Sequence, residues 1–344
     1  MDRWLENKAR DGVKPNTLRT YQDAARLAIV PSLGRIKLAK LRPLDVENML
    51  SRYAKAGKSP AWAAYKLRVL KMSLKQAVRW DMVPRNVAEA IKAPRQTQRE
   101  MSVWMPEEAD RFLKCAEPHR LYAAFYTTLM TGMRRGELLG LRWADVDLDQ
   151  SRLHVRHNLI EVRVDAVPGK RHAGKETVSA VEVRLTTPKT AGSRRTILLS
   201  AGTVRELRAH RERQAVERRT AGSAWADDDF VFASPLGGHT DPRTFYGWYL
   251  ALCLTSGVRR IRFHDLRHTA ASLMIRRGIP PKTVSERLGH ADVAFTLRVY
   301  THLYDEQKEE AAFDLADLIA DEKVKKAEKE KRAKKADQDE PDAA

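Results

Sequence analysis

The segment from Ser59 to Arg79 constrains the fold most, because it carries two distinct stripes at helical spacing. Ser59 suits a helix N-cap and Pro60 suits the first turn. The apolar stripe consists of Ala63, Leu67, Leu70, Leu74 and Val78. The basic stripe, roughly 100° further around the helix, consists of Arg68, Lys71, Lys75 and Arg79. We therefore predict a helix that packs on one side and can lie along a phosphate backbone on the other, the alternative being a solvated basic face.

The rest of the first 95 residues also has helical periodicity with short breaks. One helix is expected from a cap at Asn16 or Thr17 to a point before Pro31, and another opens at Arg42 and Pro43. The following residues are polar and lack periodicity. We therefore expect a helical domain over residues 1–95 and a linker over residues 96–105.

The pattern of the remaining residues predicts helices interrupted by a few strands. A helix begins at Pro106, and the apolar run 121–130 predicts a buried helix. The expected strands lie at residues 152–156, 178–185 and 195–198, with a Gly- and Lys-rich loop at 165–177. These elements predict a mainly α domain over 106–319, followed by a charged, disordered tail over 320–344.

The net charge of +18 is concentrated at one end of the chain. Residues 1–100 contain 22 Lys and Arg against 9 Asp and Glu, whereas the Lys-rich tail from residue 321 is balanced. A basic module of this kind is typical of proteins that bind polyanions, although a generically basic domain would have the same composition.

Several protein classes are disfavoured by what the sequence contains. No apolar run approaches the ~20 residues of a membrane helix, and the N-terminus lacks the apolar core of a signal peptide. Two distant cysteines, Cys115 and Cys253, form neither a metal-site pattern nor a disulfide framework. We expect a cytoplasmic, nucleoid-associated protein without a metal or other cofactor.

Six residues together match the needs of metal-free phosphoryl transfer. Arginine forks hold phosphoryl oxygens, so Arg134 and Arg267 are candidates. Tyr300 can act as the nucleophile, and His264 can accept its proton or hold the phosphate. Lys189 can protonate a leaving hydroxyl, and His290 can donate to the phosphate. Taken singly, each residue also has an ordinary structural explanation, and Arg135 competes with Arg134 for its role.

The short motifs that contain these residues, and the order of the motifs, resemble those of the tyrosine recombinase, or phage integrase, family up to about residue 319. The arginine box is Thr131-Gly132-Met133-Arg134-Arg135-Gly136-Glu137-Leu138, and the His-x-x-Arg box is His264-Asp265-Leu266-Arg267-His268. The lysine element is Thr187-Pro188-Lys189-Thr190, and the last box is Leu288-Gly289-His290 with Tyr300. The resemblance implies that Arg134, Lys189, His264, Arg267, His290 and Tyr300 are catalytic, with His268 in a supporting role.

The resemblance also implies an architecture and partners. Residues 1–95 would be a core-binding domain and 106–319 a catalytic domain with a small antiparallel sheet, clamped around double-stranded DNA. The helix expected at 305–319 would dock on a neighbouring subunit in a tetrameric synapse. Accessory DNA-bending or directionality proteins are further expected partners. Many relatives carry an extra N-terminal arm-binding domain, so this chain would be a two-domain type or would lack that part.

The implied activity is site-specific recombination through a 3′-phosphotyrosine. Two alternatives remain at this point. A type IB topoisomerase uses similar chemistry without pairing two sites, and a catalytically silent relative would only bind DNA.

Overall fold

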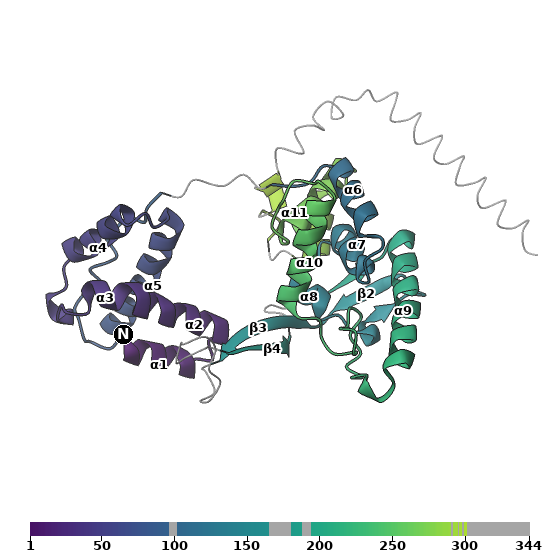
Figure 1. Ribbon diagram of the computed structural model, residues 1–344. Helices are drawn as coiled ribbons and strands as arrows, with labels where there is room; N and C mark the ends of the chain where they lie inside the picture. The colour runs from purple at the N-terminus through teal and green to yellow at the C-terminus, as the bar shows by residue number, and fades with distance from the viewer. Residues whose placement is uncertain are drawn as a thin grey trace, which may run out of the picture. The chain divides into compact units, whose positions relative to one another are not determined.

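The computed structural model describes residues 1–95, 102–164, 180–187, 194–289, 292–294, 296–297 and 299–300. These residues divide into two compact units (Figure 1). Unit 1 comprises residues 1–100 together with 161–184, and unit 2 comprises 101–160 together with 185 onward. The chain is mainly helical with small sheets, as expected from the sequence.

Unit 1 is a group of helices built on α5. Its helices are α1 (Asp2–Arg10), α2 (Pro15–Ala24), α3 (Val30–Leu33), α4 (Pro43–Lys55) and α5 (Pro60–Arg79). A π-helical turn, η1 (Ala25–Ile29), joins α2 to α3, and a 3₁₀ turn, η2 (Leu38–Lys40), precedes α4.

The helix that was predicted between a cap at Asn16 or Thr17 and Pro31 has different bounds at both ends. The helix begins at Pro15 after Lys14, rather than at a cap on Asn16 or Thr17. Proline is well suited to this first position because its missing N–H would lack a helical partner anyway. At the other end, the helical backbone continues through Pro31 to Leu33. Pro31 lies in the first turn of α3, directly after the π-helical turn, where its ring is tolerated.

The apolar stripe of α5 forms the centre of the unit 1 core, as predicted. Leu67, Leu70 and Leu74 are buried against residues of α1, α3 and α4, among them Trp4 and Met49. The predicted cap is also present, because Ser59 Oγ accepts a hydrogen bond from the Trp62 backbone N–H at 3.2 Å. Burial of Leu67, Leu70 and Leu74, at about 1.5–3 kcal/mol each, makes this stripe a substantial contribution to the stability of the unit.

Unit 2 combines helices with a three-stranded antiparallel sheet. Its helices are α6 (Pro106–Ala116), α7 (Tyr122–Thr131), α8 (Arg135–Leu139), α9 (Ala201–Ala221), α10 (Pro242–Thr255), α11 (Asp265–Arg276) and α12 (Pro281–Leu288). Short 3₁₀ turns are η3 (Trp143–Asp145) and η5 (Gly222–Ala224). The strands β1 (Val146–Asp147), β2 (Arg152–Val155) and β5 (Arg195–Leu198) lie in the order β1-β2-β5.

The strands differ from expectation in two respects, the first of which is that the short strand β1 was not predicted. A further strand, β3 (Asn158–Val164), pairs with β4 (Ala180–Thr186) in a separate two-stranded sheet, so the chain has two sheets rather than one. The chain leaves the first sheet after β2 because Arg156 and His157 bond to the buried carboxylate of Asp145, at 3.1 and 2.9 Å. The expected loop at 165–177 lies outside the described residues.

The core of unit 2 is aromatic and surrounds α7. Phe112 of α6, Phe125 of α7 and Tyr249 of α10 are fully covered, and the ring centroid of Phe112 lies 5.7 Å from that of Phe125 and 5.8 Å from that of Tyr249. Helix α7 is apolar on all sides, which is typical of a helix enclosed by its neighbours, here α6, α9 and α11. Within the described ranges, no helix combines the length and apolarity needed to cross a bilayer.

Candidate active site

The end of α7 delivers Arg134 to the site. Gly132 ends the helix in the left-handed region, with φ of +66°. The positive φ favours glycine, and a Cβ at this position would also lie 2.4 Å from Leu288 Cδ2, so that the side chain of α12 would have to shift. Arg134 then forms the N-cap of α8, and its side chain is 36% exposed. It is therefore held by the fold and still accessible from solvent.

Arg134 is fixed by the buried carboxylate of Glu137, one turn later. Its Nη1 donates to Glu137 Oε1 at 2.6 Å, and its backbone N–H donates to Oε2 at 3.0 Å. Burial raises the pKa of Glu137, but the Arg195 and Arg134 guanidiniums outweigh this and hold the pKa below its usual value. The carboxylate is thus ionised at neutral pH and orients the arginine.

Arg267 occupies the first turn of α11 and is almost completely buried. Its guanidinium donates to the backbone oxygen of Gly132 at 2.8 Å and to that of Leu288. Burial, with the nearby charges of Arg134 and Arg195, lowers its pKa to about 9. The side chain therefore remains cationic at neutral pH, in a position set by two other helices.

His264 lies directly before α11 and is the third predicted residue in this region. Burial lowers the pKa of its imidazole, and the charges of Arg267 and Arg134 lower it further. The ring is therefore neutral at pH 7 and able either to accept a proton or to donate a hydrogen bond.

Tyr300 is buried, with only 2% of its surface exposed. Its hydroxyl forms a 2.6 Å hydrogen bond with His268 Nδ1, not with His264. Burial raises the pKa of the Tyr300 phenol, although the Arg267 charge opposes this. Burial and the neighbouring His264 lower the pKa of His268 to about 4. In this state the phenol is un-ionised and covered.

The structure thus brings four of the six predicted catalytic residues, Arg134, His264, Arg267 and Tyr300, to one region of unit 2. Lys189 and His290 lie outside the described residues. The segment 305–319, the expected synapsis helix, and the tail 320–344 also lie outside them.

Two residues of the site were not assigned a role from the sequence, Glu137 and Arg195. Glu137 falls inside the arginine box and Arg195 begins the strand expected at 195–198, but the contact between them joins residues 58 positions apart. Arg195 Nη2 donates to Glu137 Oε2 at 3.0 Å, which joins β5 to α8. The available signal was the spacing of Glu137, which follows Arg134 by three residues at the start of a helix, as in a capping box.

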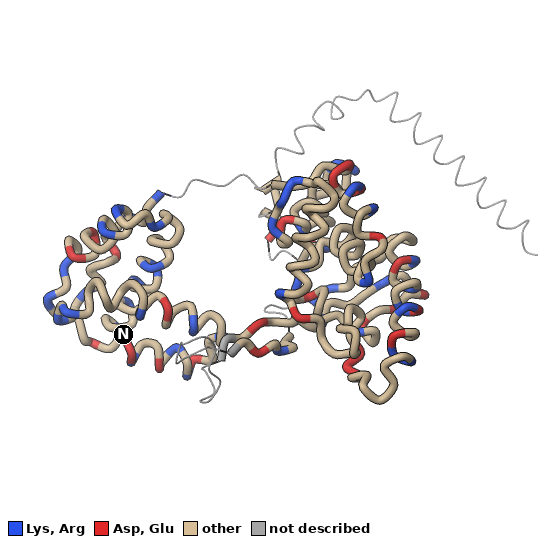
Figure 2. Tube along the Cα trace, in the orientation of Figure 1, with Lys and Arg blue, Asp and Glu red and all other residues tan. Residues whose placement is uncertain are grey.

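The basic stripe proposed for DNA binding lies in unit 1. Arg68, Lys75 and Arg79 are exposed on α5, whereas Lys71 is half-buried and its Nζ donates to the Glu89 carbonyl at 3.2 Å. Lys and Arg recur along α4 and α5, as Figure 2 shows. The stripe is thus presented to solvent by three of its four members.

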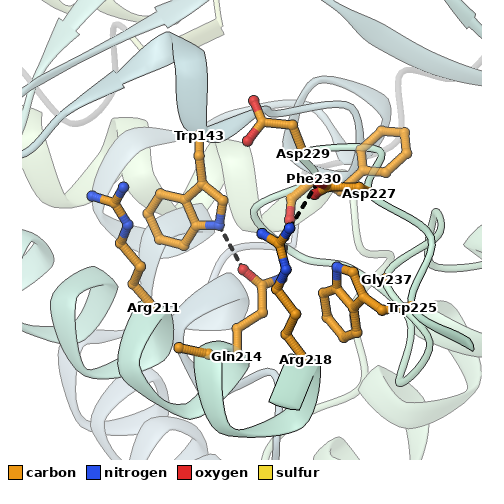
Figure 3. Close-up of a pocket in the computed structure, with 10 residues that line it drawn as sticks. Trp143, Arg211, Gln214, Arg218, Trp225, Asp227, Asp229, Phe230 and Gly237 are labelled. Atoms are coloured by element: carbon orange, nitrogen blue, oxygen red, sulfur yellow. Dashed lines mark hydrogen bonds and ion pairs between the residues drawn. The ribbon is translucent and has the colours of Figure 1, made fainter. Parts of the chain in front are cut away.

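A separate cavity of about 190 Å³ lies beside α9 in unit 2. Its polar groups bond to one another, because Trp143 Nε1 donates to Gln214 Oε1 at 2.6 Å and Arg218 pairs with Asp227 at 2.8 Å (Figure 3). None of the four predicted catalytic residues that the structure describes lines this cavity.

Comparison with known protein families gives matches over both units. Residues 103–307 match the phage integrase family, and residues 1–53 match the N-terminal SAM-like domain of phage integrases.

Individual relatives and solved structures agree with these matches. A tyrosine recombinase XerC-like protein of Caldanaerobacter subterraneus subsp. tengcongensis is 30% identical over 329 residues, which cover 93% of this chain and 82% of that protein. The fold is similar to that of the Tn1549 transposon integrase in complex with a circular intermediate DNA, with a TM-score of 0.70, 20% identity, and coverage of 89% of this chain and 97% of the other. It is also similar to a lambda integrase tetramer bound to a Holliday junction, with a TM-score of 0.62, 19% identity, and coverage of 87% and 75%. The chain belongs to the phage integrase family of tyrosine recombinases.

Proposed function

We propose that this chain is a site-specific DNA recombinase that cleaves and rejoins strands through a 3′-phosphotyrosine at Tyr300, without a metal or nucleotide cofactor. The observation that supports the proposal most is the convergence of Arg134, Arg267, His264 and Tyr300 at the contact between α7, α11 and α12. Two guanidiniums fixed by the fold supply the positive charge that a phosphoryl transition state requires.

The proposed step transfers one phosphodiester from DNA to the enzyme. The Tyr300 oxygen attacks the phosphorus while its proton passes to the neutral His264, the bond to the 5′ oxygen breaks, and the phosphate remains joined to the DNA 3′ end and to tyrosine. Arg134, Arg267, His264 and His290 stabilise the phosphoryl oxygens, and Lys189 gives a proton to the leaving 5′ oxygen. Attack by the 5′ hydroxyl of a partner strand reverses the step, so the bond energy is conserved.

The burial of Tyr300 adds a requirement to this scheme. A nucleophile that is 2% exposed and bonded to His268 cannot meet a phosphodiester in that position. We propose that cleavage requires the segment carrying Tyr300 to move. The phenol would then lose its hydrogen bond to His268 and lie close to the positive charges of Arg134 and Arg267.

The proposed partners are double-stranded DNA and further copies of this chain. The basic stripe of α5 supports the first, because exposed Lys and Arg on one helix can follow a phosphate backbone. The second is supported by the likeness of the fold to lambda integrase, which has been seen as a tetramer on a Holliday junction.

The test is a suicide substrate, a nicked duplex that traps the covalent intermediate. The wild-type chain should form a covalent protein–DNA adduct, and Tyr300→Phe should form none while its affinity for duplex stays within a few-fold, because the ring still packs. Adduct formed by Tyr300→Phe would show that another residue attacks.

The adduct assay and a second assay with a two-site plasmid together separate the two alternatives. A silent DNA-binding relative would give no adduct with the wild-type chain. A type IB topoisomerase would give the adduct and relax supercoiled plasmid, but would not exchange strands between two sites on one plasmid. Recombinant product from the two-site plasmid is the expected result.

A further inference from the structure

Three arginines converge on the end of α12. Arg195 Nε donates to the carbonyl of Arg287 at 2.8 Å, Arg267 donates to that of Leu288, and Arg134 donates to that of Gly289 at 3.4 Å. The last carbonyls of a helix have no partner within the helix and carry partial negative charge. The end of α12 is therefore a row of acceptors that holds three guanidiniums side by side.

Arg195 differs from the other two guanidiniums in its connections. It extends from β5, its side chain is only 6% exposed, and its Nη2 donates to Glu137 Oε2 at 3.0 Å. The second oxygen of Glu137 accepts from Arg134 at 2.6 Å. One buried carboxylate thus links a covered arginine to the arginine that solvent can reach.

This arrangement has two consequences for Arg134. The carboxylate cannot rotate freely, because both of its oxygens are engaged, so the direction of the Arg134 guanidinium is fixed. The negative charge of Glu137 is also shared between two cations, which leaves more of the positive charge of Arg134 available to an anion. Removal of Arg195 would loosen the carboxylate and let it neutralise Arg134 more completely.

Arg195 also acts on the element that holds Arg267. Its bond to the Arg287 carbonyl ties β5 to α12, and Arg287 Nη1 returns a bond to the Leu198 carbonyl of β5 at 2.8 Å. The carbonyl that fixes Arg267, on Leu288, is the next one along. The position of α12 relative to α11 is thus set partly by Arg195.

We propose that Arg195 is a positioning residue of the phosphate site, which presents Arg134 through Glu137 and Arg267 through the end of α12. The proposal rests on the proposed function and adds a residue outside the six that were predicted to be catalytic. Arg195 is too well covered to contact DNA itself, so its effect should fall on the rate of cleavage rather than on affinity.

The experiment measures the rate of cleavage separately from the affinity for DNA, by using a suicide substrate at saturating concentration. Arg195→Gln should lower the first-order rate of adduct formation on the order of 10²-fold, as a displaced catalytic group does, with the Kd for duplex within about threefold. Arg195→Lys should recover part of the rate, because it keeps the charge but reaches two partners with one nitrogen.

The matched control is Arg120→Gln. Arg120 makes a comparable clamp on parts of unit 2 that carry none of the predicted catalytic residues, with bonds of 2.5 and 2.6 Å to Glu217 of α9 and a further bond to the Ala233 carbonyl. Its loss should lower the melting temperature, as the loss of Arg195 should, and leave the cleavage rate of the folded protein unchanged. If Arg195→Gln does not fold, the comparison of Arg195→Lys with Arg120→Lys takes its place.

A double-mutant cycle that combines Arg195→Gln with Glu137→Gln tests whether Arg195 acts on Arg134 through Glu137. If Arg195 acts through Glu137, the double variant should cleave about as slowly as the slower single variant. Normal cleavage by Arg195→Gln, or a loss equal to that of Arg120→Gln at matched stability, would overturn the inference. Absence of adduct in the wild type would instead overturn the proposed function, so the two failures are distinguishable.

Discussion

At the scale of single residues, two adjacent arginines have different surroundings. Arg134 bonds to Glu137 and to the end of α12, whereas Arg135 Nη1 donates to the Pro242 carbonyl of α10 at 3.2 Å. Arg134→Ala should therefore slow adduct formation about 10²–10³-fold or more, the usual effect of losing a preorganised charge donor. Arg135→Ala should cost mainly stability, on the order of 1 kcal/mol for one hydrogen bond.

Single-turnover cleavage and urea unfolding of the two alanine variants check this prediction. Arg267→Ala serves as the reference for a lost phosphate contact. If Arg135→Ala cleaved more slowly than Arg134→Ala, the assignment of the catalytic arginine within the box would be off by one residue.

The sequence was enough to identify the catalytic candidates that belong to motifs. It did not indicate which residues would form hydrogen bonds with them. The order of the boxes was enough to name Arg134, His264, Arg267 and Tyr300, and the structure brings these together. It did not indicate that Tyr300 would bond to His268 in a covered position, because that bond depends on how the chain after α12 folds back onto α11. The bridge from Arg195 to Glu137 spans 58 positions, beyond the reach of any local pattern.

At the scale of elements, α5 was predictable because its two stripes obey one period. Its cap, its buried stripe and its exposed basic residues all agree with that period. Strand β3 was missed, since its pairing with β4 is separate from the main sheet and depends on the turn made by Arg156 and His157 at Asp145. Short strands are decided by such tertiary contacts more than by their own residues.

The basic stripe of α5 yields a quantitative prediction for DNA binding. Log affinity falls as log salt rises, and each phosphate contact that is removed should make this slope shallower by about 0.9. Lys75→Gln should give this full change, because its side chain is exposed. Lys71→Gln should give less, because its Nζ already donates to the Glu89 carbonyl. Binding titrations at four salt concentrations measure both slopes, and an unchanged slope in the variant with all four residues replaced would leave a solvated face as the explanation.

At the scale of the whole molecule, the proposed self-association can be tested by truncation. The helix expected from the sequence at 305–319 would have its apolar residues largely along one side, and residues from 321 onward are balanced in charge. Truncation after Ala320 should leave the pairing of two DNA sites intact, whereas truncation after Asp305 should leave single-site binding and abolish pairing. Native gels with a labelled site measure both states. Tetrameric complexes formed by the shorter chain would show that this segment is not the docking element.

The stability of the whole chain should also depend on pH through His210. This residue of α9 is 1% exposed and contacts the Val231 carbonyl through Nε2 at 2.8 Å. Burial lowers the pKa of its imidazole to about 4, from an ordinary value of 6.5. As the pH falls below 6.5, the unfolded chain takes up a proton at this position and the folded chain does not, so stability is lost until the pH reaches about 4. The interval corresponds to roughly 3 kcal/mol.

Urea unfolding at pH 7 and pH 4.5 measures this loss, and His210→Gln isolates the contribution of one side chain. Glutamine keeps an N–H donor for the Val231 carbonyl but does not titrate. The variant should start less stable at pH 7, because its side chain fills the site less well, and should lose about 2–3 kcal/mol less than the wild type between the two pH values. The remaining loss belongs to the other histidines whose pKa is lowered by burial, His119, His264 and His268, and to the acidic groups. Equal losses in both proteins would mean that His210 is protonated in the folded state, and the buried, neutral imidazole described here would be wrong.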